Sequence, residues 1–122
     1  MKIINKLVIL YNLLNITHSL VIPKIGYIYI IKEREFINSN TNIYKIGRTQ
    51  NILERVKNYP KNSKLHYTVF VNDVVNTETK LIKLFICHFN HRKDIGREYF
   101  EGDVKQMIDI IHNNTKDLVD IY

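Results

Sequence analysis

Several residue types are rare or absent in this chain, and each absence excludes a kind of structure. The single cysteine, Cys87, rules out an intrachain disulfide and a metal cluster of thiolates. We expect it to be a buried, unreactive thiol on a helix. With four glycines, two prolines and no Gly/Ser-rich stretch, no flexible linker or repeat divides the sequence. Its 122 residues are therefore expected to form one domain with a modest core.

A long hydrophobic run is also missing. The most apolar stretch, Leu7–Leu14, follows Lys2 and Lys6 and is interrupted by Asn12. It falls well short of the roughly 18–20 apolar residues that cross a bilayer, so no stable membrane insertion is expected. We predict an amphipathic helix over residues 1–24 that docks on the domain. A signal or membrane-associating segment, which would imply secretion, and a disordered extension are the alternatives.

Acidic residues are outnumbered by basic ones, 12 to 18, which gives a net charge of +6. This balance favours a polyanionic partner, nucleic acid before membrane. A basic surface that serves only solubility is the alternative. The chain is rich in isoleucine, lysine and asparagine and has no alanine or tryptophan. We interpret this as the codon bias of an A/T-rich genome, such as that of a virus or phage.

Hydrophobic patterning predicts an α/β domain of the α+β kind, with a three-stranded antiparallel sheet flanked by helices. The first predicted strand places Tyr27, Tyr29 and Ile31 on one face and Ile28 and Ile30 on the other. Apolar side chains on both faces indicate a central, covered strand. The remaining elements are strands at 43–48 and 65–71 and helices from about 51 to 59, from the Thr77 cap to about 89, and after a loop at 91–102.

We divide the chain into three parts: the N-terminal segment at 1–24, the folded domain at 25–113 and a C-terminal tail at 114–122. Pro23 closes the first part, because proline restricts the residue before it and cannot continue a helix. The last predicted helix has an apolar stripe that ends at Ile111. The sequence contains no signal for oligomeric state.

Two basic clusters are candidates for nucleic-acid contact. The first carries Lys45, Arg48, Arg55, Lys57, Lys61 and Lys64, and the second carries His88, His91, Arg92, Lys93 and Arg97. Tyrosines within the first cluster would either stack on bases or fill the core. The two histidines of the second have the spacing of a zinc half-site, but a third matching ligand is missing. Cationic side chains at a helix C-terminus are the simpler explanation of that run.

Glu78 is the most suggestive carboxylate. Counting along its predicted helix places Leu81, Ile82 and Phe85 on the same face, which packs against the sheet. A carboxylate on that face needs a partner or a metal ion to offset its loss of hydration. The alternative is a first-turn carboxylate that only interacts with the helix dipole, a contribution of about 0.3–1 kcal/mol.

Taken together, these motifs resemble the GIY-YIG nuclease superfamily. Gly26–Tyr29 matches the first half of its signature, Tyr44–Thr49 the second, and Arg55 the arginine of the helix that follows. Glu78 matches the acidic residue of the later helix. The closer likeness is to the phage and viral open-reading-frame DNA-binding branch, which has a fungal relative, because Gly96–Phe100 matches its Gly-x-Glu-aromatic-Phe element.

The resemblance covers residue 26 to about residue 103 and implies a site. Tyr29 would act as general base or position the attacking water, and Arg55 would stabilise charge on the phosphate. Glu78 would hold one Mg²⁺ or Mn²⁺. Lys45 stands where the second tyrosine is expected, and Tyr44 points to the opposite strand face. Lysine can bind phosphate or, with a lowered pKa, act as a base.

A second departure concerns the residues that complete the site. No equivalent of the asparagine that closes the nuclease motif is evident, and Glu98 would either assist the metal ion or pair with a nearby arginine. We therefore expect a DNA-binding protein, with double-stranded DNA favoured over RNA, that acts inside the cell. Metal-dependent endonuclease activity is the open question. A catalytically silent nucleic-acid-binding module and a basic protein-interaction domain are the alternatives.

Overall fold

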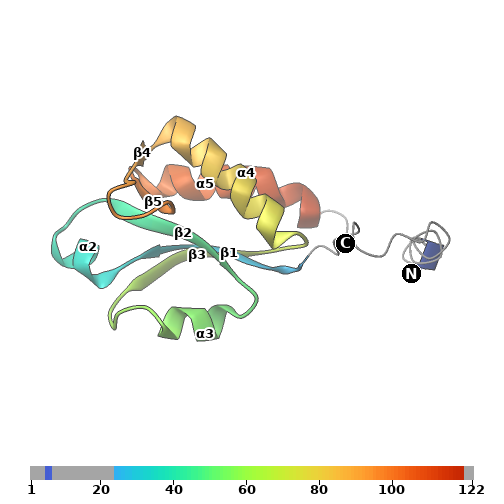
Figure 1. The fold of residues 1–122 in the computed structure, drawn as a ribbon, viewed down its shortest axis with the longest axis horizontal. Coiled ribbons are helices and arrows are strands. Elements are labelled where there is room, and N and C mark those ends of the chain that lie inside the picture. Colours follow the sequence, from blue (N-terminus) through green and yellow to red (C-terminus); the bar gives the residue numbers. More distant parts are fainter. Residues whose placement is uncertain (1–4, 7–23, 120–122) are drawn as a thin grey trace.

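The computed structural model of the protein describes residues 5–6 and 24–119. Within residues 24–119 a five-stranded antiparallel sheet has the strand order β3-β1-β2-β5-β4 (Figure 1). In chain order the elements are β1 (Gly26–Lys32), α2 (Arg34–Asn38), β2 (Ile43–Thr49), α3 (Ile52–Lys57), β3 (Lys64–Val71), α4 (Val74–His88), β4 (Asn90–His91), β5 (Tyr99–Glu101) and α5 (Val104–Val119).

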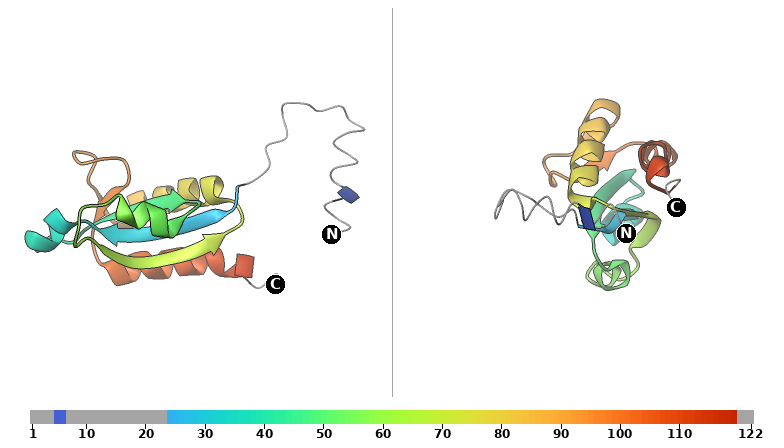
Figure 2. Two further views of the ribbon diagram at one scale, coloured as in Figure 1. Left: turned by 90° about the horizontal axis from the view of Figure 1, so that it is seen from below. Right: turned by 90° about the vertical axis from the view of Figure 1, so that its right-hand side faces the viewer.

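The alternation of β1 separates the two faces of the sheet, as expected for a central strand. Ile28 and Ile30 are fully buried under α4 and α5, where they meet Leu81, Phe85 and Met107. Each buried side chain of this size stabilises the fold by about 1.5–3 kcal/mol. Tyr29 points to the other face, where its hydroxyl meets that of Tyr59 just after α3. Figures 1 and 2 show α3 on the side of the sheet opposite to α4 and α5. The two faces of β1 therefore place different chemistry on opposite sides of the sheet.

The prediction of three strands is wrong, because the sheet has five. The segment that we expected to be a loop, residues 91–102, contains β5 and the second residue of β4. Phe100 of β5 is fully buried, and its backbone pairs with Tyr44 of β2. Strands of two and three residues are too short to show an alternating pattern, so packing of Phe100 decides their position. The short helix α2 was likewise not predicted.

Two local predictions about α4 also need correction. The helix begins at Val74 after an Asp73 cap, whose side chain accepts from the backbone N–H of Asn76, so Thr77 is not the cap. The segment offers two cap candidates, and burial of Val74 selects the earlier one. Cys87 is exposed rather than buried. It lies on the outer side of α4, two residues after the core residue Phe85.

The last helix extends further than its apolar stripe suggested. α5 runs to Val119, so it includes the first part of the segment that we assigned to a tail, and Thr115 is buried. The three-part division of the chain stays a prediction, and the N-terminal helix expected at 1–24 lies almost wholly outside the described residues. No helix of the described ranges is long and apolar enough to cross a membrane.

Candidate functional site

The α3 side of the sheet carries a cluster of aromatic hydroxyl groups, which we call the tyrosine cluster: Tyr29, Tyr59 and Tyr99 with Lys45. Tyr29 is 1% exposed, and its hydroxyl oxygen lies 2.6 Å from that of Tyr59. Gly47 stands directly opposite Tyr29 on β2. A Cβ at Gly47 would lie only 2.4 Å from Cζ and Oη of Tyr29. The glycine of the signature is therefore required for the tyrosine ring to lie across β2.

The environment of Tyr29 keeps its hydroxyl protonated. Burial raises its pKa far above the usual value of a tyrosine, and the hydrogen bond with Tyr59 adds to the effect. The positive charges of Arg55 and Lys45 lower it only in part. Burial raises the pKa of Tyr59 as well. At neutral pH both groups are phenols that donate and accept hydrogen bonds.

Lys45 belongs to the tyrosine cluster. Its Nζ atom lies 5.1 Å from the centre of the Tyr59 ring and 5.6 Å from that of Tyr99, and 3.7 Å from Oε2 of Glu98. Tyr44, its neighbour in the chain, points to the other face and is buried in the core. The place of the second signature tyrosine is thus occupied by a cation that two aromatic rings and a carboxylate hold in position.

Two carboxylates beside β2 form what we call the acidic pair: Glu78, which comes from α4, and Glu98, which precedes β5 and also contacts Lys45. Glu78 is 4% exposed, and its Oε1 accepts a hydrogen bond of 3.1 Å from Nε of Arg48. Its Oε2 is buried and has no hydrogen-bond partner among the residues that the structure describes. The backbone carbonyl of Glu98 accepts from the N–H of Ile46 at 3.0 Å, which anchors Glu98 beside β2.

Electrostatics connect the acidic pair. Burial raises the pKa of Glu78, and the negative charge of Glu98 raises it further. The positive charges of Arg48 and Arg97 act in the opposite direction without cancelling the effect. A buried carboxylate with one unpaired oxygen and a second carboxylate in range is a place where a cation would lower the free energy.

The predicted site residues therefore fall on two sides of β2. Tyr29, Lys45 and Arg55 come together on the α3 side, whereas Glu78 faces Arg48 on the α4 side. Glu98 connects them, because it contacts Lys45 and shifts the pKa values of both Tyr59 and Glu78. The four residues to which the resemblance assigns catalytic roles thus lie in two clusters that meet beside β2.

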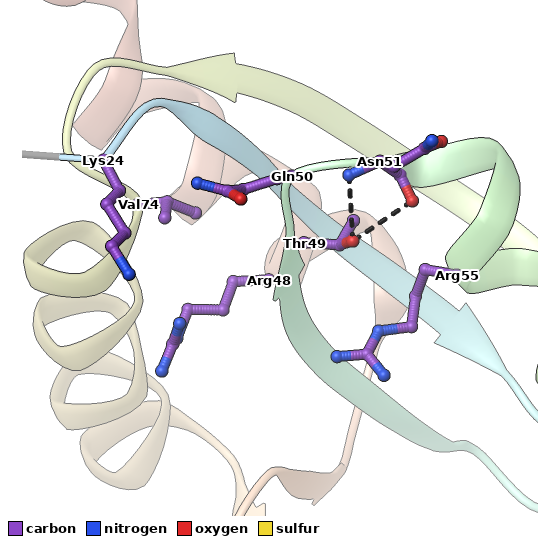
Figure 3. A pocket seen from close by; sticks show the side chains of 7 residues that line it. All are labelled: Lys24, Arg48, Thr49, Gln50, Asn51, Arg55 and Val74. Atoms are coloured by element: carbon purple, nitrogen blue, oxygen red, sulfur yellow. Dashed lines mark hydrogen bonds between the residues drawn. The ribbon is translucent and has the colours of Figure 1, made fainter.

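A pocket of about 410 Å³ opens at the end of β2. Figure 3 shows Arg48 and Arg55 on either side of the strand, with both guanidinium groups extended along the pocket. Lys24 and Asn51 also line it, and the Asn51 side chain caps α3 by accepting from the N–H of Glu54. β5 pairs with β2 only at residues 43–45, so it does not cover this end of the strand.

The other predicted basic residues lie in different settings. Lys57 is exposed, with its Nζ 4.0 Å from Oε1 of Glu54, and Lys61 and Lys64 are exposed on and after the turn between α3 and β3. Arg92 is held by two carboxylates, 2.7 Å from Asp94 and 3.0 Å from Glu101. Its charge is therefore largely neutralised. Arg97 lies within electrostatic range of Glu78.

The two histidines of the zinc hypothesis are engaged elsewhere. Nδ1 of His88 lies 2.8 Å from the carbonyl oxygen of Leu84, and Nε2 of His91 lies 2.8 Å from that of Arg97. The ring of His91 stacks on Phe100. No group of three or more possible metal ligands of the His, Cys, Asp and Glu types occurs in the described part of the chain.

Tyr59 is a site residue that the sequence offered only as one of the tyrosines in the first basic cluster, which would stack on bases or fill the core. It lies four residues after Arg55, just beyond the end of α3, so the two side chains project to the same side. That spacing was the available signal, but it could not distinguish a hydroxyl aimed at Tyr29 from a ring that fills the core. A second addition is Glu33, whose carboxylate accepts a hydrogen bond from the Tyr99 hydroxyl.

These features define a class of protein. It is an α+β domain with an antiparallel sheet, in which a tyrosine is buried beside a glycine of the next strand and arginines surround the end of that strand. The T5orf172 domain model matches residues 26–114. The chain thus belongs to the T5orf172 domain family, which is related to the GIY-YIG group. Neither the curated proteins nor the solved structures contain a significant match.

Proposed function

We propose that the protein binds double-stranded DNA and hydrolyses its phosphodiester bonds with the help of a divalent cation. The observation that carries this proposal is the buried Oε2 of Glu78, which lacks a hydrogen-bond partner and lies in range of a second carboxylate, Glu98. A buried polar atom without a partner is a rare and unfavourable feature. A function that supplies the partner explains why it is retained.

The donor set fits a hard cation. Carboxylate oxygens of Glu78 and Glu98 would hold one Mg²⁺ or Mn²⁺, with water and substrate phosphate as the other ligands. When bound, the ion would polarise a phosphate oxygen and offset the charge that develops in the reaction. The Arg48 side chain, which is 47% exposed, can turn into solvent without leaving a buried charge.

The tyrosine cluster would position the attacking water. Because Tyr29 remains a phenol, its hydroxyl acts through hydrogen bonds rather than as a ready base. Tyr59 orients that hydroxyl from 2.6 Å away. Lys45 contributes a positive charge on the same side of the sheet, suited to a phosphate oxygen. Of the two roles that the resemblance implies for Tyr29, the positioning role is the one we propose.

Arg55 and Arg48 would bind the phosphate groups around the scissile bond. Both line the pocket at the end of β2, on opposite sides of the strand (Figure 3). A guanidinium donates two hydrogen bonds to one phosphate and keeps its charge at all working pH values. The net charge of +6 favours the approach of a polyanion to this surface. We propose that the protein is of viral or phage origin and that its partner is DNA inside the cell.

Plasmid nicking tests the cleavage. Purified wild-type protein with Mg²⁺ or Mn²⁺ should convert supercoiled plasmid to the open circular form, and a chelator should stop the reaction. Glu78→Gln should slow the conversion by about 10²–10³-fold, whereas Glu54→Gln, a matched change of an exposed carboxylate, should leave it intact. Equal nicking by Glu78→Gln and wild type, or none by wild type, would overturn the nuclease proposal.

A nucleic-acid-binding module without cleavage is the second candidate. The observation that favours it is the ion pair between Arg48 and Glu78, which already occupies one carboxylate oxygen. DNA affinity measured over a salt series separates this candidate from a basic protein-interaction domain. Affinity should fall steeply with salt, with a log–log slope of about −0.9 per phosphate contact. Arg48→Ala combined with Arg55→Ala should weaken DNA binding. If the wild-type protein has no affinity for DNA at low salt, both nucleic-acid proposals are contradicted.

A further inference from the structure

Two lysines face each other directly across neighbouring strands, away from the site at the end of β2. Lys32 of β1 and Lys64 of β3 are register partners in the antiparallel pair. Like charges in directly opposite positions destabilise a sheet. Neither lysine takes part in any ion pair among the described residues.

A β-bulge creates this juxtaposition. Ile30 pairs with Tyr67 and Ile31 with Leu65, so His66 has no partner on β1. In a regular ladder His66 would stand opposite Ile31, and Leu65 rather than Lys64 would stand opposite Lys32. Bulges turn individual side chains and are frequent beside functional sites. The bulge thus places Lys64 directly opposite Lys32.

An imidazole and one of the two lysines meet at the phenol ring of Tyr44. The ammonium of Lys32 lies 5.1 Å from the centre of the Tyr44 ring, and the His66 imidazole meets that ring edge-on with centroids 5.3 Å apart. Burial lowers the pKa of His66, and the charges of Lys64 and Lys32 lower it further. The carboxylate that acts in this neighbourhood is Asp103, which raises the pKa of Tyr44. Lys32 and Lys64 both lie near enough to His66 to disfavour its imidazolium form, so their positive potential reaches this ring.

We propose that Lys32, Lys64 and His66 form a second phosphate-binding site, which holds the backbone of the bound nucleic acid at a point separate from Arg48. The inference rests on the proposed DNA binding. Arg48 pairs with Ile28, four residues before Lys32, so the two sites are separated by about 13 Å along β1 at ~3.3 Å per residue. This separation allows the two contacts to meet different phosphate groups of one duplex.

A double substitution, Lys32→Gln with Lys64→Gln, tests the site. Its log–log salt slope for duplex binding should be less steep than that of wild type by about 0.9 for each lost phosphate contact. Lys80→Gln with Lys83→Gln, on the exposed side of α4, removes the same charge and should leave the slope unchanged. The thermal midpoint of the first variant should not fall, because a repulsive pair is removed.

His66 supplies a second measurement that does not depend on substitution of the lysines. Its imidazole pKa, followed by NMR, should rise when duplex DNA binds, because a nearby phosphate favours the imidazolium. An unchanged His66 pKa in the complex contradicts the proposal. A second pair of results also contradicts it: the His66 pKa rises equally with inorganic phosphate at the same ionic strength, and the Lys32 and Lys64 variant has the salt slope of wild type. Together these results would indicate a general anion site.

The two proposals fail in different ways. If wild type binds DNA and Arg48→Ala with Arg55→Ala weakens it, while the Lys32 and Lys64 variant matches its control, DNA binding stands and the second site is wrong. In that case Lys64 serves only to protect the edge strand β3 from pairing with other chains. If wild type has no affinity for DNA, the proposed function itself fails.

Discussion

The tyrosine cluster and Glu78 lie on opposite sides of β2, and they differ in how their polar atoms are paired. On the α3 side, the hydroxyls of Tyr29 and Tyr59 bond to each other and that of Tyr99 bonds to Glu33. On the α4 side, one oxygen of Glu78 bonds to Arg48 and the other has no partner. Both regions are largely withdrawn from water, so burial alone does not account for the difference.

The contrast assigns different tasks to the two regions. A satisfied network holds its groups in one geometry, which suits the positioning of a reactant. A buried carboxylate with an unpaired oxygen and a carboxylate neighbour is destabilising until a cation arrives, which suits binding of a metal ion. Substitutions in one region should therefore affect stability and activity in different proportions from substitutions in the other.

Glu78→Gln should give the largest effect on activity. Plasmid nicking is expected to fall by about 10²–10³-fold, the range observed when one electrostatic contact to a transition state is removed. The free energy of unfolding should hold or rise, because the neutral amide loses less hydration than the carboxylate. Nicking assays and chemical denaturation measure the two changes. A large loss of stability would mean that Glu78 serves mainly as the partner of Arg48.

Gly47→Ala should give the largest effect on stability. The added methyl group overlaps the Tyr29 ring and hydroxyl, and such overpacking destabilises a core by about 1–3 kcal/mol. Denaturant unfolding measures the loss. The same substitution in a Tyr29→Leu background should cost clearly less, because the clashing atoms are gone. Equal losses in both backgrounds would contradict the direct contact between Gly47 and Tyr29.

Tyr59→Phe should have a smaller effect, and it should lower the cleavage rate rather than the affinity for DNA. The substitution removes the partner of the buried Tyr29 hydroxyl, at about 1–3 kcal/mol of stability. Nicking should slow by about tenfold, the lower end of what one misplaced catalytic contact costs. Tyr27→Phe, on the same strand face, is the control and should change neither quantity. A loss of DNA affinity with an unchanged cleavage rate would argue for a base-stacking role instead.

The smallest effect concerns pH. Burial and Glu98 raise the pKa of Glu78 in the folded protein, so the protonated carboxyl adds to the free energy of unfolding. This contribution is fully present below the ordinary pKa of a glutamate. That contribution is lost as pH rises through the raised value. Metal-dependent nicking needs the ionised form of Glu78. On acidification, the nicking activity should therefore decline at a higher pH than it would if Glu78 had the pKa of an ordinary glutamate. NMR titration of the Glu78 side-chain carboxyl carbon provides the check; an unshifted or lowered pKa contradicts it.

Much of the sheet was predictable from local patterning. The alternation in β1, the polar turn before β2 and the apolar stripes of the later helices follow from periods of two and 3.6 residues, which need no knowledge of contacts. β4 and β5 were not predictable, because elements of two or three residues have no period. Phe100 determines their position by filling a gap in the core.

The candidate site divides in the same way. Tyr29, Gly47 and Arg55 could be named from the sequence because they stand at the motif positions that resemble the signature. The hydrogen bond from Tyr29 to Tyr59 was not, since it joins residues thirty positions apart. The electrostatic influence of Glu98 on Glu78 was not predictable either, because these two residues also come from different elements.

Lys45 is the residue whose meaning changed most between sequence and structure. In the sequence it marks the loss of a tyrosine from the signature. In the folded protein its ammonium lies over the Tyr59 ring, and Tyr59 places a hydroxyl beside Tyr29 from a different element. Strand periodicity decided which face each residue occupies. Only packing of distant segments decided which hydroxyls, cations and carboxylates meet, because those contacts depend on how α3, α4 and the β5 segment settle around β2.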